Sequence, residues 1–254
     1  MIAPALHHKI DGSGPHVVLL HPVGLDLTFL EPLAAELCRS FTVLSVDLRG
    51  HGHSPALPPA RSLDDYADDV YVLLSTRGFA PAAVVGFSFG GMVAQHLALK
   101  YPKDVSALAI CACPSTLKPE NRVIAAERGA QAEREGIGVV LDATLDRWFT
   151  AEFRASGAAD AARNRLLSDN VVAWAEAWRA MAAIDTSARL GAIQVPTLCV
   201  AGELDKSSPP EIVAAIAERI VGARFVVIPG APHMLFIEQP RAVARVIGDF
   251  LAGL

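Results

Sequence analysis

Gly86-Phe87-Ser88-Phe89-Gly90 is the stretch of sequence that decides the fold. A short apolar run, 82–85, precedes it, and a helix-forming run, 91–99, follows it. A G-x-S-x-G pattern between a strand and a helix is typical of a nucleophile elbow. The glycines are needed because the turn brings the strand and helix backbones close together and leaves no room for a Cβ atom. A serine held there meets a base and the amides of a helix N-terminus, whereas an ordinary turn serine would meet neither.

The composition indicates a compact globular protein. The chain has 254 residues, of which 52% are hydrophobic and 19% charged, enough for one large α/β domain or two small ones. The formal net charge is −5 and there is no basic run, which argues against nucleic-acid binding. Residues 1–14 do not have the pattern of a signal peptide, and no apolar run approaches the roughly 20 residues that span a bilayer. We therefore expect a cytoplasmic protein without a membrane partner.

The cysteines do not predict a metal site. They stand at positions 38, 111, 113 and 199, and the last three lie in apolar runs. The C-x-C pair lacks the spacing and the partner histidines of a zinc site. Reduced thiols in the core are the better interpretation, and neither a metal nor an organic cofactor is implied.

Apolar runs alternate with helix-length segments along most of the chain. Several of these runs are almost continuously apolar, as expected of parallel strands that are buried on both faces. The alternation predicts a doubly wound, mostly parallel sheet. The expected strands are 16–21, 41–48, 82–86, 105–113, 196–201 and 223–229, and the expected helices are 28–39, 62–77, 90–101, 209–220 and 240–252.

One region, 117–190, contains no strand-like run. It is rich in alanine, arginine and glutamate, has helical spacing, and holds all three tryptophans. It interrupts the alternation late in the chain. We predict that 1–116 and 191–254 form the α/β core and that 117–190 is a helical cap over one end of the sheet.

His233 is the candidate base. It follows a Gly/Pro-rich loop after the last expected strand, at the edge where open α/β sheets bind ligands. A solvated surface histidine is the alternative. His96 is a weaker candidate because it lies two helical turns beyond Ser88. His51 and His53 form an H-x-H pair in a turn, and the absence of an evident third metal ligand favours a structural loop.

The acid that orients His233 should also follow a strand. The expected strand 196–201 is followed by Gly202-Glu203-Leu204-Asp205, whereas no carboxylate closely follows 105–113. Asp205 is the preferred residue because it lies deeper in the loop, and its role would be to stabilise the imidazolium form. Glu203 is the alternative.

An oxyanion site needs two backbone donors. One is the N–H of Phe89, directly after the serine. The other is expected from the loop His21-Pro22-Val23-Gly24, where Pro22 has no N–H to donate and Val23 has one.

The chain now resembles the α/β-hydrolase family over nearly its whole core. In the first matching motif, 21–24, the family usually has glycine at the second position, where this chain has Pro22. The resemblance implies a mostly parallel sheet flanked by helices, and a catalytic Ser88, Asp205 and His233. The matching motifs occur in family order at 21–24, 47–54, 86–90, 201–205 and 230–233.

Shorter stretches are similar to the 3-oxoadipate enol-lactonases of aromatic catabolism. They are 24–26, 142–150 with Phe153, and 195–197. This likeness implies hydrolysis of an enol-lactone that carries a free carboxylate, with Arg147 and Trp148 as candidate substrate-binding residues. An exposed helix arginine beside a core tryptophan is the alternative for that pair.

Several other activities use the same three residues. A generic carboxylesterase, a C–C bond hydrolase and a perhydrolase or haloperoxidase-like enzyme all remain open, because the cap pocket separates them. Dehalogenases and epoxide hydrolases of this fold use an aspartate at the elbow, so Ser88 argues against both. A non-enzymatic ligand receptor would be free to lose members of the triad, and all three are present. The expected partner is a small ester or lactone, and the sequence gives no oligomeric state.

Overall fold

A computed structural model describes residues 5–60 and 62–254 of the chain. The first four residues of the segment inspected for a signal peptide, and of the predicted core, lie outside the described residues. The centre of the fold is a seven-stranded sheet in the order β1-β3-β2-β4-β5-β6-β7, in which only β1 runs antiparallel to its neighbour. The strands are β1 (His8–Gly12), β2 (His16–Leu20), β3 (Thr42–Val46), β4 (Ala82–Phe87), β5 (Val105–Cys111), β6 (Thr197–Gly202) and β7 (Arg224–Ile228).

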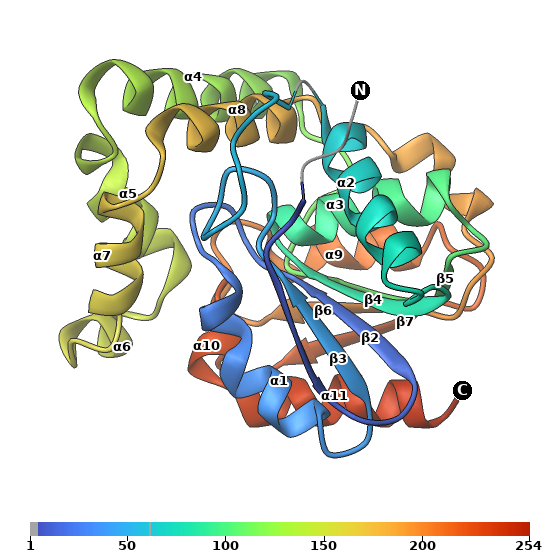
Figure 1. Cartoon of the computed structure of the whole chain (residues 1–254). Coiled ribbons are helices and arrows are strands. Elements are labelled where there is room, and N and C mark those ends of the chain that lie inside the picture. Colours follow the sequence, from blue (N-terminus) through green and yellow to red (C-terminus); the bar gives the residue numbers. More distant parts are fainter. Residues whose placement is uncertain (1–4, 61) are drawn as a thin grey trace.

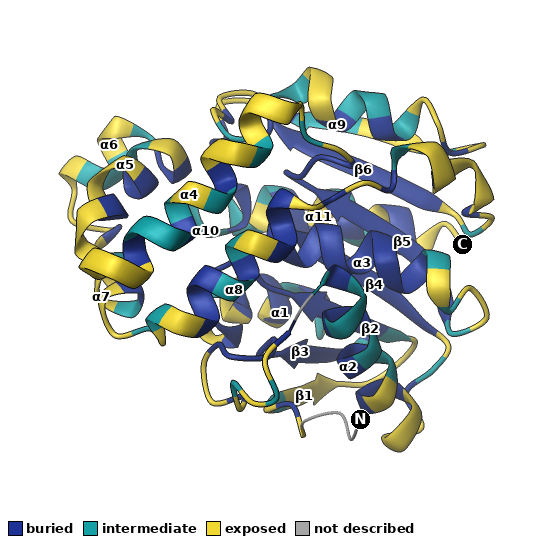
Figure 2. Cartoon of the chain, turned by 90° about the horizontal axis from the view of Figure 1, so that it is seen from above, coloured by how far each residue is buried: buried dark blue, intermediate teal, exposed yellow. Residues whose placement is uncertain are grey.

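The middle of the sheet is deeply buried. Every residue of β4 is buried, and Val84 pairs with Val18 of β2 and Leu108 of β5. Helices on both faces explain why these strands lack polar alternation. By contrast β1 is an exposed edge strand with the sequence HKIDG, as the exposed colouring in Figure 2 shows. That strand was not predicted because it has no apolar pattern to detect.

The helices of the core cover the two faces of the sheet. Helices α2, α3 and α9 lie on one side, and α1, α10 and α11 on the other (Figure 1). Ser62 and Asp65 form a capping box at the start of α2, in which the Ser62 N–H donates to Asp65 Oδ2 at 3.0 Å. The core helices are α1 (Glu31–Leu37), α2 (Leu63–Thr76), α3 (Phe89–Lys100), α9 (Pro210–Ala217), α10 (Leu235–Glu238) and α11 (Pro240–Ala252).

Most predicted elements differ from the structure by one to three residues at a boundary, and two of the differences reflect a local change of backbone conformation. The start of the first predicted helix, 28–39, is a 3-10 turn, η1 (Leu27–Leu30), which precedes α1. The predicted strand 105–113 ends at Cys111 because Ala112 adopts φ +52°, outside the strand region. The short helix α10 was not predicted.

Five helices occupy the stretch between β5 and β6, apart from the 3-10 turn η2 (Ser187–Ala192). They form a group beside one end of the sheet (Figure 1). The two longest, α4 and α8, pack closely because Gly129 has no side chain: a Cβ there would lie 2.9 Å from Trp178 Cβ. We propose that this group is the predicted cap, 117–190. Its helices are α4 (Pro119–Glu135), α5 (Gly138–Trp148), α6 (Ala151–Ala155), α7 (Asp160–Leu167) and α8 (Val171–Ala182).

Candidate active site

The turn that carries Ser88 joins β4 to α3. Ser88 has φ +51° and ψ −113°, a strained conformation for a residue with a side chain. Crowding explains the flanking glycines: a Cβ on Gly86 would lie 2.2 Å from the Gly90 carbonyl oxygen, and one on Gly90 would lie 2.3 Å from that of Leu20. The Ser88 N–H donates to the Cys111 carbonyl at 2.8 Å and holds the turn against the end of β5. The turn therefore presents the hydroxyl at the carboxyl edge of the sheet.

The loops after β6 and β7 meet at a second close backbone approach. A Cβ on Gly202 would lie 2.5 Å from the carbonyl oxygens of both Ala231 and Pro232. The Leu204 N–H also donates to the Ala231 carbonyl, at 2.8 Å. This contact brings the loop of Asp205 against the loop of His233.

Asp205 is buried and fully hydrogen-bonded. Its Oδ1 accepts the backbone N–H groups of Ser207 and Ser208 at 2.7 and 2.8 Å, and its Oδ2 lies 2.8 Å from His233 Nδ1. Burial by itself would raise the pKa of the Asp205 carboxyl, but the His233 charge and these hydrogen bonds lower the pKa below its usual value. Asp205 is therefore an anion that can only accept, so the proton of the imidazole belongs on Nδ1.

The other imidazole nitrogen faces the serine. His233 Nε2 lies 2.9 Å from Ser88 Oγ, and both side chains are buried. With the proton on Nδ1, Nε2 accepts a hydrogen bond from the Ser88 hydroxyl. The three side chains come from three different strand ends and form one hydrogen-bonded line.

Glu203, the alternative acid, does not reach His233. Its Oε2 accepts the Gly230 N–H at 2.7 Å and fastens the loop after β7. His96 Nδ1 lies 2.7 Å from Asp64 Oδ1 on α2, away from Ser88. The structure thus groups Asp205, rather than Glu203, with the serine and the histidine.

The His51 loop is held by backbone and ionic contacts. His51 Nδ1 lies 3.0 Å from the Arg49 carbonyl oxygen, and the His53 N–H donates to Asp47 Oδ2 at 2.9 Å. Arg49 forms a buried ion pair with Asp69 of α2 at 2.5 Å. Within residues 5–60 and 62–254, no group of three or more His, Cys, Asp or Glu side chains is arranged to hold a metal ion.

The predicted oxyanion donors border the same site. Val23 lines the cavity beside Ser88, and Phe89 begins α3. Within the described part of the chain, neither backbone N–H has a hydrogen-bond partner. The Val23 loop is held by His21, whose Nδ1–H donates to the Pro22 carbonyl at 2.7 Å and whose Nε2 accepts the Leu48 N–H at 2.9 Å.

A cavity of about 190 Å³ opens above Ser88. The core contributes its floor and the cap helices its walls. Both Arg147 and Trp148, predicted from the family resemblance, line it. The other lining residues besides Ser88 and His233 are Val23, Met92, Pro114, Leu117, Asn121, Ile124, Ala125, Arg128, Trp178, Met181, Ser207 and Ser208.

Sequence reasoning missed most of the cap wall, including Arg128. Leu117, Asn121, Ile124 and Arg128 are spaced three and four residues apart, which is the spacing of one helix face. That signal was available, but it does not say whether the face turns toward the core, a cavity or solvent.

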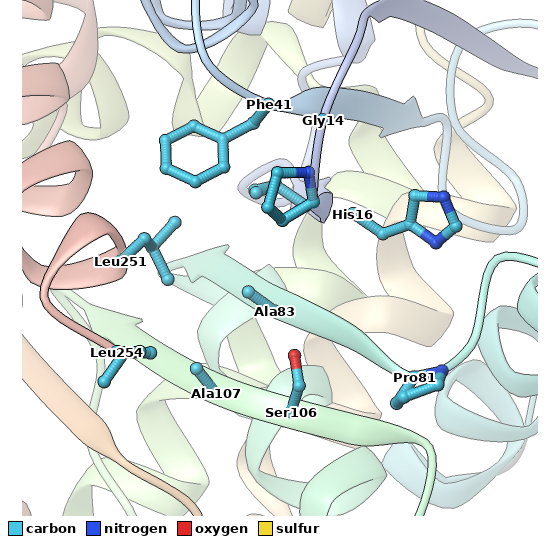
Figure 3. Close-up of a pocket in the computed structure, with 11 residues that line it drawn as sticks. Gly14, His16, Phe41, Pro81, Ala83, Ser106, Ala107, Leu251 and Leu254 are labelled. Atoms are coloured by element: carbon cyan, nitrogen blue, oxygen red, sulfur yellow. The ribbon is translucent and has the colours of Figure 1, made fainter.

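A larger hollow, about 450 Å³, lies at the opposite edge of the sheet (Figure 3). The amino ends of β2, β4 and β5 line it, together with Leu251 and Leu254. Its His16 is already engaged, because Nδ1 lies 2.9 Å from the Phe79 carbonyl oxygen and the ring stacks on Phe79. Size alone would select this hollow, but the hydrogen-bonded serine and histidine lie in the smaller one.

The chain is similar to known hydrolases along most of its length. A pimeloyl-[acyl-carrier protein] methyl ester esterase from Chromobacterium violaceum is 32% identical over 94% of this chain and 95% of its own. A 3-oxoadipate enol-lactonase from Acinetobacter baylyi is 25% identical over 95% of this chain and 90% of its own. The crystal structure of the enol-lactonase from Burkholderia xenovorans LB400 superposes with a TM-score of 0.91 at 32% identity, covering 97% of this chain and 96% of that one.

No helix among the described residues is both long and apolar enough to cross a bilayer. The model of the alpha/beta hydrolase family matches residues 17–246, which includes the whole sheet except β1 and the first residue of β2. The strand order, the turn at Ser88 and the late helical insertion lie within this match. The chain belongs to the alpha/beta hydrolase family.

Proposed function

We propose that the protein is a serine hydrolase that cleaves small carboxylic esters or lactones through an acyl-enzyme on Ser88. The line Ser88 Oγ–His233 Nε2–His233 Nδ1–Asp205 Oδ2, with its 2.9 and 2.8 Å contacts, carries the proposal. The line is buried and opens into the cavity, so a substrate carbonyl can reach the hydroxyl while the base stays shielded from bulk water.

In the first half-reaction, Ser88 Oγ attacks the carbonyl carbon while its proton moves to His233 Nε2. The carbonyl oxygen becomes an oxyanion that accepts from the backbone N–H groups of Val23 and Phe89. Collapse of this intermediate breaks the bond to the leaving oxygen, which takes the proton from His233 Nε2 and so leaves His233 neutral. In a lactone the leaving oxygen stays attached to the acyl group, because only the ring opens.

In the second half-reaction, His233 removes a proton from a water molecule, which attacks the acyl carbon. The bond from that carbon to Ser88 Oγ breaks, and Oγ recovers a proton from His233. Asp205 remains an anion throughout and stabilises the imidazolium that forms in each half-reaction.

The preferred substrate is 3-oxoadipate enol-lactone or a close analogue, which would place the protein in aromatic catabolism. An enolate is a good leaving group, so the reaction needs little acid assistance, and no acid other than His233 is proposed. The small cavity and its arginines suit a compact substrate with a carboxylate. Hydrolysis of a methyl ester on a carrier-bound acyl chain is the second candidate, because the relative from C. violaceum, at 32% identity over nearly its whole length, has that name.

A substrate panel tests the proposal. Wild-type protein should hydrolyse p-nitrophenyl acetate, whereas Ser88→Ala should lose at least about 10³-fold in rate. 3-Oxoadipate enol-lactone and monomethyl and dimethyl esters of dicarboxylic acids then rank the two candidates. Equal rates for wild type and Ser88→Ala would rule out the serine mechanism.

A further inference from the structure

We propose that Arg128 forms a subsite for a free carboxylate in the cavity beside Ser88. The favoured substrates would then be esters or lactones of dicarboxylic acids whose second carboxyl group is ionised. This inference rests on the proposed function, because the subsite selects among substrates that Ser88 attacks. It also names a residue that neither the sequence motifs nor the resemblance to enol-lactonases indicates.

Arg128 is held in place on the cavity wall. It lies on the α4 face that lines the cavity and is half-buried. Its Nη1 donates to Thr144 Oγ1 of α5 at 3.1 Å, and its guanidinium carbon lies 5.2 Å from the centroid of the Trp178 ring. A hydroxyl and an aromatic face orient the guanidinium without neutralising its charge.

The missing counterion distinguishes Arg128 from most arginines of helices α4–α8. Six of them have a carboxylate partner: Arg122, Arg134, Arg154, Arg163, Arg165 and Arg179. Among the described residues, no carboxylate lies within ion-pair distance of the remaining two, Arg128 and Arg147. Those two are also the arginines that line the cavity. Because the two arginines without a carboxylate partner are the two that line the cavity, we infer that a carboxylate of the substrate pairs with them.

The electrostatics favour an anion at Arg128. Burial and the nearby charge of Arg147 both lower the pKa of the Arg128 guanidinium below its ordinary value. A half-buried cation with no counterion is costly, and a bound carboxylate would relieve that cost. The Trp178 indole N–H, which is buried and has no partner among the described residues, leaves a second donor unfilled near this cation.

Arg147 is placed for a different contribution. It is exposed, and its Nη2 donates to the Lys206 carbonyl at 3.4 Å. Water and salt screen an exposed charge strongly. Arg147 therefore attracts anions to the cavity, whereas the half-buried Arg128 supplies most of the binding.

A free-carboxylate subsite separates the two candidate substrates. Hydrolysis of an enol-lactone of 3-oxoadipate leaves the second carboxylate free to bind Arg128. A methyl ester of a dicarboxylic acid whose other end is attached to a carrier has no free carboxylate to offer. The subsite therefore favours the enol-lactone type of substrate.

Two p-nitrophenyl esters with the same number of acyl carbons test the subsite. One is mono-p-nitrophenyl glutarate, which has a free carboxylate, and the other is p-nitrophenyl pentanoate, which has none. Wild type should favour the glutarate ester, and Arg128→Met should reduce that kcat/KM preference by about 10- to 100-fold, the effect of losing a charge-assisted hydrogen bond. The loss should fall mainly on KM, because the anion binds away from the reacting carbonyl.

Two further variants serve as controls. Arg128→Lys keeps the charge and should restore part of the preference. Arg134→Met removes an exposed arginine of the same helix that is paired with Glu127, and it should leave the preference unchanged. The same ratio of kcat/KM values in wild type and Arg128→Met would overturn the proposal.

A binding experiment separates this proposal from the proposed function. Glutarate itself should bind wild type and bind Arg128→Met about 10-fold more weakly by calorimetry, with Arg128→Lys in between. This readout needs no turnover, so it remains decisive if wild type hydrolyses neither ester and the serine mechanism fails. Equal glutarate affinity in all three proteins would contradict the subsite.

Discussion

The core and the cap meet at one cavity but are built on opposite principles. In the core, the Asp205 carboxylate has each oxygen hydrogen-bonded, and the imidazole of His233 is bonded on both sides. In the cap, Arg128 faces the same cavity with only a hydroxyl and a ring as partners. The hydrogen-bonded serine, histidine and aspartate can act on any substrate that presents a carbonyl. The guanidinium of Arg128, which has no counterion, favours a substrate that carries a carboxylate. We propose from this comparison that the core determines the reaction and the cap determines the substrate.

The largest effect is expected at Asp205, one of the two acids in the loop after β6. Asp205→Asn should lower kcat on p-nitrophenyl acetate by about 10⁴-fold, because the amide favours the wrong imidazole tautomer and cannot stabilise imidazolium. Glu203→Gln is the matched control, since among the described residues the Glu203 carboxylate accepts only the Gly230 N–H, and the variant should stay within a few-fold of wild type. Rates measured side by side decide the matter, and a loss in Glu203→Gln equal to that in Asp205→Asn would contradict the assignment.

The close backbone approach at Gly202 should be nearly as sensitive. Gly202→Ala places a methyl group 2.5 Å from two carbonyl oxygens of the His233 loop, so we expect about 3 kcal/mol of lost unfolding free energy and a large fall in kcat. Gly138→Ala in the cap is the control, because its Cβ would meet nothing within 4 Å. Urea unfolding should show no loss of stability for that variant. Equal stability of the two variants would show that the loops can separate without cost.

The His21 side chain below the Val23 loop should make the core acid-sensitive. Burial, and then the charge of His51, lower the pKa of His21 from 6.5 to about 4. Above pH 6.5 both folded and unfolded states are neutral at this residue. As the pH falls from 6.5 to 4, the unfolded state takes up a proton that the folded state does not, so up to about 3 kcal/mol of stability is lost.

A substitution at His21 isolates this contribution. His21→Asn should be less stable than wild type at pH 8 but should lose less additional stability between pH 6.5 and 4. Denaturant unfolding across that range measures both slopes. If the two proteins lose stability equally on acidification, His21 is not the group responsible.

The smallest effect is expected in the cap, on selectivity rather than on rate. Met181 lines the cavity, and Met181→Ala would enlarge that cavity. The ratio of kcat/KM for p-nitrophenyl hexanoate over acetate should therefore rise by about 10-fold. Val123→Ala, on the exposed face of α4, should leave that ratio unchanged. A fall in acetate turnover as large as that of Asp205→Asn would instead place the chemistry partly in the cap.

The sequence predicts the core better than it predicts the cap. The core could be predicted because its packing restricts the residue types. Glycines are required where backbones touch, and strands buried on both faces appear as apolar runs. Ser88, Asp205 and His233 each follow a predicted strand, and the structure brings them within hydrogen-bond distance.

The remainder could not be predicted because it depends on partners distant in sequence. The significance of Arg128 lies in the absence of a nearby carboxylate, which only the folded arrangement of α4, α5 and α8 shows. The edge strand β1 is polar, and its pairing with β3 determines its conformation. The sequence favoured Asp205 over Glu203 only by its place in the loop, whereas the structure shows that Asp205 contacts His233 and Glu203 contacts Gly230.

The central claim, that Ser88 forms an acyl-enzyme, can be tested most directly by intact-protein mass spectrometry. Wild type mixed with p-nitrophenyl acetate and quenched in acid within milliseconds should gain the mass of one acetyl group, which peptide mapping should place on Ser88. Asp205→Asn should accumulate the adduct more slowly, and Ser88→Ala should show none. Turnover of the ester without any Ser88 adduct, or an adduct that persists in Ser88→Ala, would contradict the account.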